Sequence, residues 1–568
     1  MIVDSSNRFD YIVVGAGSAG CVTASRLVRD HGARVLLLEA GRRDANPLFR
    51  MPAGFIRLLK GSPHVTFHRT IPQPQLGGRT LEIPQGHVLG GSSTVNGMVY
   101  MRGRPSDYDE WDRASGHAGW SYHDLLPHFV RLEGNQRLHD EWHGSDGPLK
   151  VSDHPSRCAL TDAFVEAVQR LGVPFNPDFN GARQEGVGCM QLTAHAGRRC
   201  SAADAFLRPV IGDPRLVLRL GAAVTSLEFS GSRVTGVRFR DASGLATAHA
   251  DREVIVTAGA FATPKLLMLS GVGPADALRR HGIDVRADLP GVGSNLQDHH
   301  EVPVMAATRG AYGYFGEDRG WRMVRNGLRY LLFRTGPVTS NGVEACAFVD
   351  PGNAGGGPSL QLYCVPTIYA DRGNTTVEAT HGVTLNACLL RPRARGSVRL
   401  ASTDPSAPPL IDSGFLSDDD DMRVSIAGLR FSREVLASSP LDRMIARELS
   451  PGPGVVSDAD LREHCKRTVK TNYHPVGTCR MGAADDPLAV VTPDLRVRGV
   501  DGLRIFDASM MPNVVSGNTN AVVMAVADRA VAVMMGESLP AAAMPARHLM
   551  SPVSPRLRDM SPAGGSAG

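Results

Sequence analysis

The sequence lacks the features that mark metal proteins and disulfide-linked proteins. Its nine cysteines are scattered and include no Cys-x-x-Cys pair, so neither a disulfide framework nor a zinc site is indicated. Its 19 histidines include no His-Glu-x-x-His spacing. The pair His139 and His143 and the doublet His299-His300 are therefore interpreted as surface or hydrogen-bonding residues, and no metal site is predicted.

An excess of charge and a long apolar run are also missing. The chain has 61 basic and 57 acidic residues and no basic tract, which argues against a nucleic-acid surface. The longest apolar candidate, 521–535, is interrupted by Asp528 and Arg529, so no membrane span is predicted. No signal-peptide pattern precedes the first apolar segment, which predicts a cytoplasmic protein. Peripheral contact with the inner face of the cell membrane is left open, and nothing indicates an oligomeric state.

A glycine-rich turn lies between two apolar runs near the start of the chain. Gly15, Gly17 and Gly20 follow the run 11–14, and Glu39 closes the run 35–38. This spacing predicts a strand, a tight turn, a helix and a second strand, in which backbone N–H groups approach a pyrophosphate and Glu39 accepts hydrogen bonds from a ribose. The unit alone does not separate FAD from NAD.

Small residues follow apolar runs at several later points. The Gly- and Ser-rich segment 86–97 predicts a loop of exposed backbone donors for another part of the same cofactor. Segments 253–260 and 503–509 predict further strands of a doubly wound sheet that end at the ligand, and 517–520 leads into a helix that reaches about residue 535.

The remaining segments predict a second region. Residues 160–172 have the pattern of an amphipathic helix, and 215–240 that of a strand pair broken at 230–232. From 304 to 470, alternating strands such as 383–389 and 397–400 predict an antiparallel sheet with flanking helices, which would form a substrate cap. Prolines and glycines at 537–568 predict a disordered tail.

Together these motifs resemble the glucose-methanol-choline family of FAD-dependent alcohol oxidoreductases, from about residue 9 to 535. The resemblance rests on the glycine turn with Glu39, on Gly-Gly-Ser-Ser at 90–93, on 259–273, and on His-Pro-Val-Gly-Thr-Cys-Arg-Met-Gly at 474–482 with Gly-Asn-Thr-Asn at 517–520. Segments 39–44, 177–181, 198–201 and 336–338 look like those of bacterial FAD-dependent L-sorbose dehydrogenases. Polyethylene-glycol, aliphatic-alcohol and choline dehydrogenases look more distant.

The resemblance implies a fold of the α/β class with an α+β cap: a Rossmann-like FAD-binding domain interleaved with an antiparallel-sheet substrate domain. It implies an FAD-binding region at 8–303, part of the cap at 304–391, and a C-terminal region at 392–535 that carries the catalytic histidine and returns to the FAD domain. The residues implied to bind FAD are Gly15, Gly17, Ser18, Gly20, Glu39, Ala40, Gly90, Ser92, Asn96, Gly97, Val224, Ala258, Gly259, Asp507, Ala508, Asn518 and Thr519.

His474 and Asn518 are the predicted catalytic residues. Oxidation of an alcohol removes a hydroxyl proton and a hydride from one CH–OH group, and the resemblance implies that the hydride goes to flavin N5. His474 would take the proton and then, as imidazolium, stabilise the oxygen, to which Asn518 would also donate an N–H. We expect activity to rise with pH through the histidine range.

Two further residues bear on how FAD is held. Family members that attach FAD covalently have a histidine where this chain has Val95, so we expect non-covalent FAD. The helix after Gly517 would point its positive end at the pyrimidine end of the flavin, and Asn518 or Asn520 could also serve as its N-cap.

The sequence leaves the substrate open. The resemblance favours a primary alcohol, a sugar or a polyol such as L-sorbose; choline would need a cage to which Glu344 could belong, although Glu344 is equally a structural residue. Tyr473 is expected to line the pocket or to pack. The electron acceptor could be a quinone, a soluble carrier or oxygen, with a dye or quinone favoured. A non-redox relative of the hydroxynitrile lyase type and a flavin protein without turnover are the alternatives to an oxidoreductase.

Overall fold

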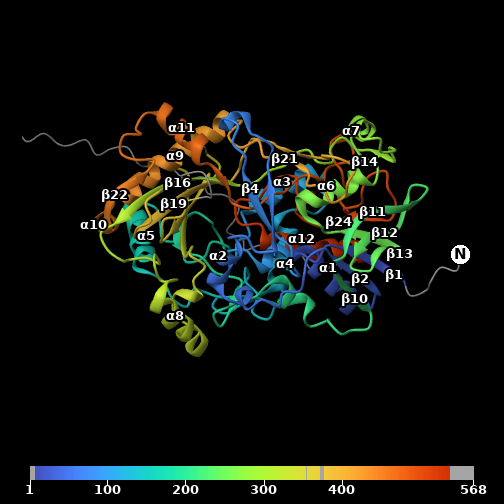
Figure 1. Ribbon diagram of the computed structural model, residues 1–568, viewed down its shortest axis with the longest axis horizontal. Helices are drawn as coiled ribbons and strands as arrows, with labels where there is room; N and C mark the ends of the chain where they lie inside the picture. Colours follow the sequence, from blue (N-terminus) through green and yellow to red (C-terminus); the bar gives the residue numbers. More distant parts are fainter. Residues whose placement is uncertain (1–6, 353–354, 371–376, 538–568) are drawn as a thin grey trace, which may run out of the picture.

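Two sheets, one at each end of the molecule, organise the chain (Figure 1). The computed structural model describes residues 7–352, 355–370 and 377–537. The predicted tail at 537–568 lies outside the described residues except for Glu537, whose carboxylate accepts hydrogen bonds from buried Arg26 at 2.6 and 2.7 Å.

The first sheet is the predicted nucleotide-binding sheet. The apolar runs at 11–14 and 35–38 are fully buried strands, because helices cover the sheet and leave its central strands no solvent face. Antiparallel pairing of 223–230 with 233–241 confirms the predicted hairpin, and a third strand at 216–220 joins the parallel part. The order is β10 (Leu216–Leu220), β2 (Val35–Glu39), β1 (Arg8–Val14), β13 (Gly244–Val256), β12 (Arg233–Asp241), β11 (Ala223–Ser230), with β24 (Leu503–Ile505) parallel to the end of β13.

Three helices position the cofactor end of this sheet. Helix α1 (Ser18–Arg29) begins directly after the glycine turn, α6 (Gly259–Leu269) follows β13, and α12 (Asn520–Met535) packs against α1. The predicted strand-turn-helix arrangement at the start of the chain is confirmed.

The second sheet is antiparallel and forms the cap. Its alternating residues pack in opposite directions: Ala345 and Ala347 face the core beneath helices, whereas Cys346 and Phe348 pack on the other side. The strands in order are β22 (Ile445–Ser450), β16 (His300–Thr308), β19 (Gly382–Leu389), β18 (Leu360–Val365), β17 (Ala345–Val349) and β7 (Gly186–Cys189), with β23 (Lys470–Thr471) on β16 and with helices α5 (Ala159–Arg170), α9 (Asp419–Leu436) and α11 (Asp458–Thr468) against one face.

The cap differs from the sequence prediction in two ways. Strand 397–400 does not join the cap sheet, because both edges of β19 are already paired, with β16 and β18. It forms β20 (Ser397–Arg399), which pairs only with β21 (Leu410–Asp412) in a sheet of its own. The cap also takes β7 and α5 from within 8–303, so the two regions interleave earlier in the chain than the predicted start of the cap at 304.

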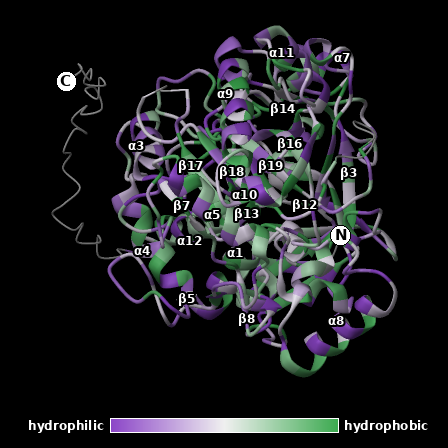
Figure 2. Ribbon diagram, turned by 90° about the vertical axis from the view of Figure 1, so that its left-hand side faces the viewer, coloured by the Kyte–Doolittle hydropathy of each residue, from purple (hydrophilic) through white to green (hydrophobic). Residues whose placement is uncertain are grey.

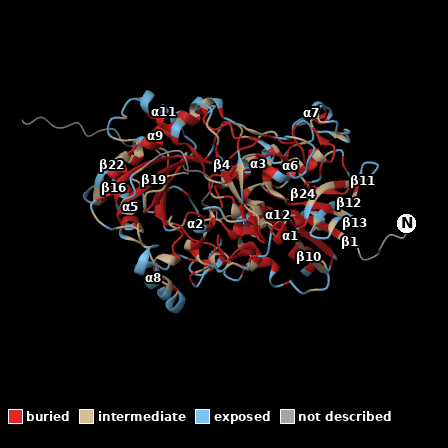
Figure 3. Cartoon of the chain, in the orientation of Figure 1, coloured by how far each residue is buried: buried red, intermediate tan, exposed pale blue. Residues whose placement is uncertain are grey.

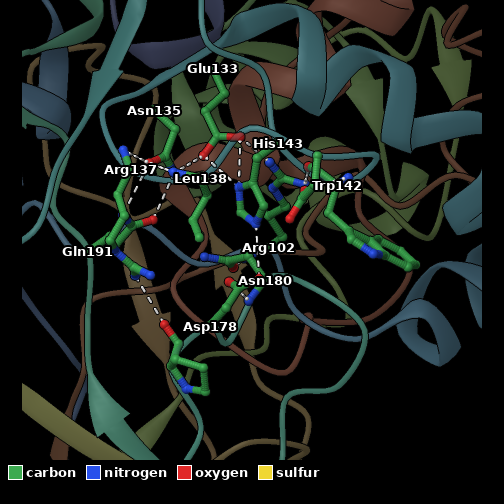
Figure 4. A network of polar contacts seen from close by, with 12 residues as sticks. Arg102, Glu133, Asn135, Arg137, Leu138, Trp142, His143, Asp178, Asn180 and Gln191 are labelled. Atoms are coloured by element: carbon green, nitrogen blue, oxygen red, sulfur yellow. Dashed lines mark hydrogen bonds and ion pairs between the residues drawn. The ribbon is translucent and has the colours of Figure 1, made fainter.

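A buried ionic network holds several loops together (Figure 4). The Arg102 guanidinium donates to Glu133 at 2.5 Å and to the carbonyl of Trp142 at 2.6 Å, and His143 lies between Glu133 and Asp178 at 3.1 Å from each. Burial alone would raise the pKa of Glu133, but Arg102 holds it below its ordinary value. His143 is thus a hydrogen-bonding residue, as predicted, while His139 is exposed.

Shorter elements connect these units. They are α2 (Phe55–Leu58), β3 (Val65–Arg69), β4 (Glu82–Gly86), α3 (Pro105–Ala114), α4 (Tyr122–Leu132), β5 (Glu133–Asn135), β6 (Leu149–Val151), β8 (Ala194–His195), β9 (Arg198–Arg199), β14 (Val272–Gly273), α7 (Ala275–Arg280), β15 (Ala287–Asp288), α8 (Gly320–Phe333) and α10 (Leu441–Met444).

Candidate active site

A cavity of about 1310 Å³ runs from the glycine turn of β1 to His474, between the two sheets. Both predicted catalytic residues line it. Gly20 and Gly90 do not, and they belong to the packing around the turn. The predicted FAD residues in the lining are Gly15, Gly17, Ser18, Glu39, Ala40, Ser92, Asn96, Gly97, Val224, Ala258, Gly259, Asp507, Ala508, Asn518 and Thr519.

The three glycines of the turn serve different purposes. Gly15 has φ +103°, and a Cβ there would lie 2.6 Å from the carbonyl oxygen of Thr257. A Cβ on Gly20 would lie 1.8 Å from the carbonyl oxygen of Gly15, so this glycine lets α1 pack on the strand. A Cβ on Gly17 would meet no protein atom within 4 Å and would stand in the cavity. Packing therefore requires glycine at 15 and 20, whereas at 17 glycine keeps the cavity open to a ligand.

The second glycine-rich loop packs onto the first. Gly90 has φ +87°, and its N–H donates to the carbonyl of Ala16 at 2.8 Å. A Cβ on Gly91 would lie 2.7 Å from Cα of Gly17, so the two loops touch backbone to backbone. Arg199, to which the sequence assigned no role in this loop, is buried and fixes the loop by donating to Asn96 and to the carbonyl of Ser93.

The groups around Gly17 suit an anionic dinucleotide. Helix α1 begins after Gly17 without a side-chain cap and without an acidic residue in its first turn, which leaves its N–H groups to an anion. The Glu39 carboxylate accepts from the N–H groups of Ala16 and Gly41 at 2.8 and 2.7 Å, and the residue lines the cavity. The residues present thus fit FAD, with phosphates at α1 and a ribose at Glu39.

Asp507 joins two distant motifs at the cavity wall. Its Oδ2 accepts from the N–H of Gly259 at 2.9 Å and from the hydroxyl of Thr263 at 2.6 Å. This contact places the turn after β24 beside the start of α6. Val95 lies at another part of the wall, where it packs in an apolar cluster and carries no nucleophile.

Strand pairing brings His474 to the cavity. Segment 470–476 runs antiparallel to 297–301, through β23 on β16 and through reciprocal backbone hydrogen bonds between Gln297 and Val476 at 3.1 and 2.9 Å. His299 and His474 face each other across this ladder, with their Nδ1 atoms 2.9 Å apart. The doublet at 299–300 is hydrogen-bonding, as predicted, but its partner could not be known from the sequence.

The hydrogen bonds around His299 fix the tautomer of His474. His299 Nε2 lies 3.0 Å from the carbonyl of Leu390, which only accepts, so Nε2 carries the hydrogen and Nδ1 of neutral His299 is bare. His474 Nδ1 must then donate to His299. Nε2 of neutral His474 is left as the acceptor, and it lies 3.2 Å from Nδ2 of Asn518.

Burial keeps both rings neutral. It lowers the pKa of His299 to about 4 and, with the charge of His299 as a smaller cause, lowers the pKa of His474 well below 6.5. The predicted rise in activity with pH stays a prediction, and the lowered pKa of His474 places it below pH 6.5. Asp298 is a further residue missed by the sequence: it accepts from the backbone N–H of His474 at 2.7 Å, and burial raises its pKa to about 7.

Asn518 lies at the N-terminal end of α12 without capping it. The N-cap residue is Thr519, which makes no side-chain cap hydrogen bond, and Asn520 is already the first residue of the helix. The amide of Asn518 instead donates to His474, and its oxygen accepts from Tyr363 at 3.3 Å. Both interpretations of Asn518 and Asn520 as N-caps are wrong.

Glu344 does not belong to the cavity wall. Its side chain is fully buried and accepts from the hydroxyls of Thr161, Tyr314 and Ser340 and from the N–H of Cys158. It is a structural carboxylate. Tyr473 does line the cavity, and its hydroxyl lies 3.3 Å from that of Tyr369.

Family models identify the chain. The model of the N-terminal part of the GMC oxidoreductases matches residues 9–301, and that of the C-terminal part matches 392–527. The chain belongs to the GMC oxidoreductase family. It is an FAD-dependent oxidoreductase of CH–OH groups, which agrees with the fit of the turn at Gly17.

The relatives are spread over several activities. The chain is 42% identical over 537 residues to an alcohol dehydrogenase [acceptor] of Pseudomonas putida, covering 93% of this chain and 96% of the relative. It is 39% identical over 511 residues to an oxygen-dependent choline dehydrogenase of Brucella canis, covering 90% and 92%. Among solved structures, pyridoxine 4-oxidase from Mesorbium loti is 33% identical with a TM-score of 0.84, covering 93% of this chain and all of that one. Formate oxidase of Aspergillus oryzae is 26% identical with a TM-score of 0.86, covering 94% and 99%. The resemblance to L-sorbose dehydrogenases stays a prediction.

Proposed function

We propose that the protein oxidises a primary alcohol to the aldehyde, with His474 as the base. The observation that carries this proposal is the hydrogen-bond chain from Leu390 through His299, which leaves the lone pair of His474 Nε2 beside Asn518 at the cavity wall. When the alcohol binds, its hydroxyl takes the place of the Asn518 N–H at Nε2, and Nε2 then takes the hydroxyl proton. The imidazolium and the second amide hydrogen of Asn518 then stabilise the developing alkoxide.

The cofactor, when bound, supplies the hydride acceptor at N5. Residues of this chain orient it: the N–H groups of α1 and the carboxylate of Glu39 at one end, and the N-terminal end of α12 at the other. Because Val95 offers no bond-forming atom, the FAD is non-covalent. Acid precipitation would release all of it to the supernatant, and flavin in the pellet would contradict this assignment.

The wall near His474 favours an uncharged alcohol over choline. Glu301 is ion-paired with Lys470, and Glu344 is occupied by four donors outside the cavity. Both carboxylates already have partners, so neither is available to balance the charge of a quaternary ammonium. L-sorbose, other polyols and aliphatic or benzylic alcohols are the neutral candidates.

Anaerobic reduction of the bound flavin tests the proposal. The holoenzyme is mixed, without oxygen, with sorbose, polyols, choline, and aliphatic and benzylic alcohols, and the loss of flavin absorbance is followed. Bleaching by a primary alcohol with formation of the aldehyde is the expected result. If no alcohol bleaches the flavin, or if a cyanohydrin is cleaved without bleaching, alcohol oxidation is ruled out.

The same assay in air identifies the electron acceptor. We propose that dichlorophenolindophenol or a quinone analogue supports faster turnover than oxygen, since one relative carries the name alcohol dehydrogenase [acceptor]. Stoichiometric hydrogen peroxide at a comparable rate would make the protein an oxidase and would leave the role of His474 intact.

A further inference from the structure

Helix α8 (Gly320–Phe333) projects from the body of the molecule and is exposed over most of its length (Figure 3). Within this helix, only Asn326 and Tyr330 are buried. The helix is attached along this narrow stripe, and its other faces meet solvent.

One of the exposed faces is apolar. At 3.6 residues per turn, positions separated by three, seven, ten and eleven residues from Trp321 lie on one side of the helix. Figure 2 shows apolar residues alternating with polar ones along α8. We call this side the α8 stripe: its side chains are 54% to 70% exposed, and it consists of Trp321, Val324, Leu328, Leu331 and Leu332. An apolar stripe turned away from the core indicates an interaction surface.

Basic residues border the stripe. Arg322, Arg325 and Arg329 occupy the helix face beside it. In segments 55–60 and 317–334, seven basic residues stand against two acidic ones, although the whole chain has a net charge of only +4. Glu317 pairs with Arg322 and Arg325, which leaves most of the surplus uncompensated.

The attached side of α8 forms part of the cavity wall. Met323, Asn326 and Tyr330 line the same cavity that reaches His474, and Arg57 of the neighbouring α2 (Phe55–Leu58) contacts Met323. The α8 stripe therefore lies beside one boundary of the cavity in which the reaction takes place.

We propose that the α8 stripe docks the protein on the surface of an anionic lipid bilayer. An apolar stripe flanked by arginines matches an interfacial helix, which lies in the headgroup region with its apolar side toward the acyl chains. The basic surplus complements anionic headgroups. In the described residues, no helix is long and apolar enough to cross a membrane, so the contact is one of docking on the surface.

A second copy of the chain fits this surface less well. In a two-fold symmetric pair of antiparallel α8 helices, the arginine flank of one copy would lie beside the same flank of the other. Like charges would then face each other, whereas an anionic bilayer neutralises them. The proposal concerns binding alone and does not depend on the reaction.

Trp321 gives a direct test in the unmodified holoenzyme. The protein has four tryptophans, and Trp111, Trp120 and Trp142 are at most 5% exposed, whereas Trp321 is 68% exposed. Vesicles of phosphatidylcholine with about a third phosphatidylglycerol should sediment the protein. Bromine-labelled acyl chains in these vesicles should quench its tryptophan emission, and Trp321→Phe should sediment but lose the quenching.

Paired variants distinguish binding through the α8 stripe from nonspecific binding through other exposed apolar residues. Leu328→Ser with Leu332→Ser removes two stripe residues outside the cavity wall and should lower the vesicle partition constant at least about tenfold. The matched control, Ile211→Ser with Leu245→Ser, changes residues that are 46% and 59% exposed elsewhere, and it should bind like the parent. Flavin content and absorbance report folding for both.

Three results would overturn the proposal. The first is a parent protein that stays in the supernatant with anionic vesicles, and the second is equal binding to phosphatidylcholine alone. The third is a dimer, seen by sedimentation equilibrium without lipid, that the Leu328→Ser, Leu332→Ser variant dissociates, which would assign the stripe to a second copy. Binding that needs phosphatidylglycerol and the stripe supports it.

Discussion

His143 and His474 are both buried histidines, yet their surroundings drive their pKa values in opposite directions. Burial would lower the pKa of each. Hydrogen bonds to Asp178 and Glu133 more than offset burial at His143 and raise its pKa, whereas His474 has only a second neutral histidine and an amide beside its ring. Carboxylates bind both ring nitrogens of His143, whereas Nε2 of His474 has a single neutral amide partner, Asn518, which a ligand can displace.

The difference separates a structural histidine from the base that we propose in the same protein. Both nitrogens of His143 are bound by carboxylates, which hold the ring in place and leave neither nitrogen open to a substrate. At His474 one nitrogen is fixed by His299, and the other is exposed to the cavity. A general base needs one ring nitrogen held by the protein and the other within reach of the substrate.

Replacing the base is the strongest way to break this comparison. His474→Ala should lower the rate of anaerobic flavin reduction by about a hundredfold to ten-thousandfold, because the proton acceptor and its later positive charge are both lost. FAD content should be unchanged, since the substitution leaves the glycine turn and the start of α1, which would hold the phosphates, as they are. A variant that reduces flavin at the parent rate would show that another group takes the proton.

His143→Ala is the matched control for this variant. It removes a buried histidine of the same chemistry from the saturated network. Its flavin-reduction rate per bound FAD should stay close to that of the parent while its resistance to urea falls.

Breaking the network of Arg102, Glu133 and His143 should lower the stability of the fold. Glu133→Ala leaves Arg102 and His143 buried without their shared carboxylate, and an uncompensated buried charge costs about 3–5 kcal/mol. The urea midpoint, followed by intrinsic fluorescence, should fall accordingly. A midpoint within error of the parent would mean that the network does not brace the loops.

Local patterns predicted the parts of this molecule that depend on nearby residues. The glycine turn, α1 and the buried strands around it follow from apolar runs and glycine spacing within 40 residues. His299 and His474 are 175 residues apart, and their contact exists only because segment 470–476 pairs with 297–301. Glu344 is buried among donors from Cys158 and Thr161, far from it in the sequence, and β20 is separate because both edges of β19 are already paired. No local pattern records either fact.

The contact between the two histidines can be tested by itself. His299→Leu removes the acceptor for Nδ1 of His474, so the ring loses its fixed tautomer, and flavin reduction should slow about tenfold. His299→Gln offers an amide oxygen and an N–H in similar positions and should recover most of the rate. If both variants were equally slow, His299 would act through packing rather than through the hydrogen bond.

The pH profile sharpens the comparison with the smallest change to the protein. The active form of His474 is neutral, so kcat/KM should fall as pH drops through its lowered pKa, and the inflection should lie below 6.5. Asp298 titrates at about 7 and touches the backbone of His474, so a second inflection near that pH belongs to its carboxyl and should vanish in Asp298→Asn. An inflection at about 6.5 that persists in Asp298→Asn would place His474 at the ordinary histidine pKa. Burial at His474 would then be offset in the holoenzyme, and the two histidines would no longer have pKa values shifted in opposite directions.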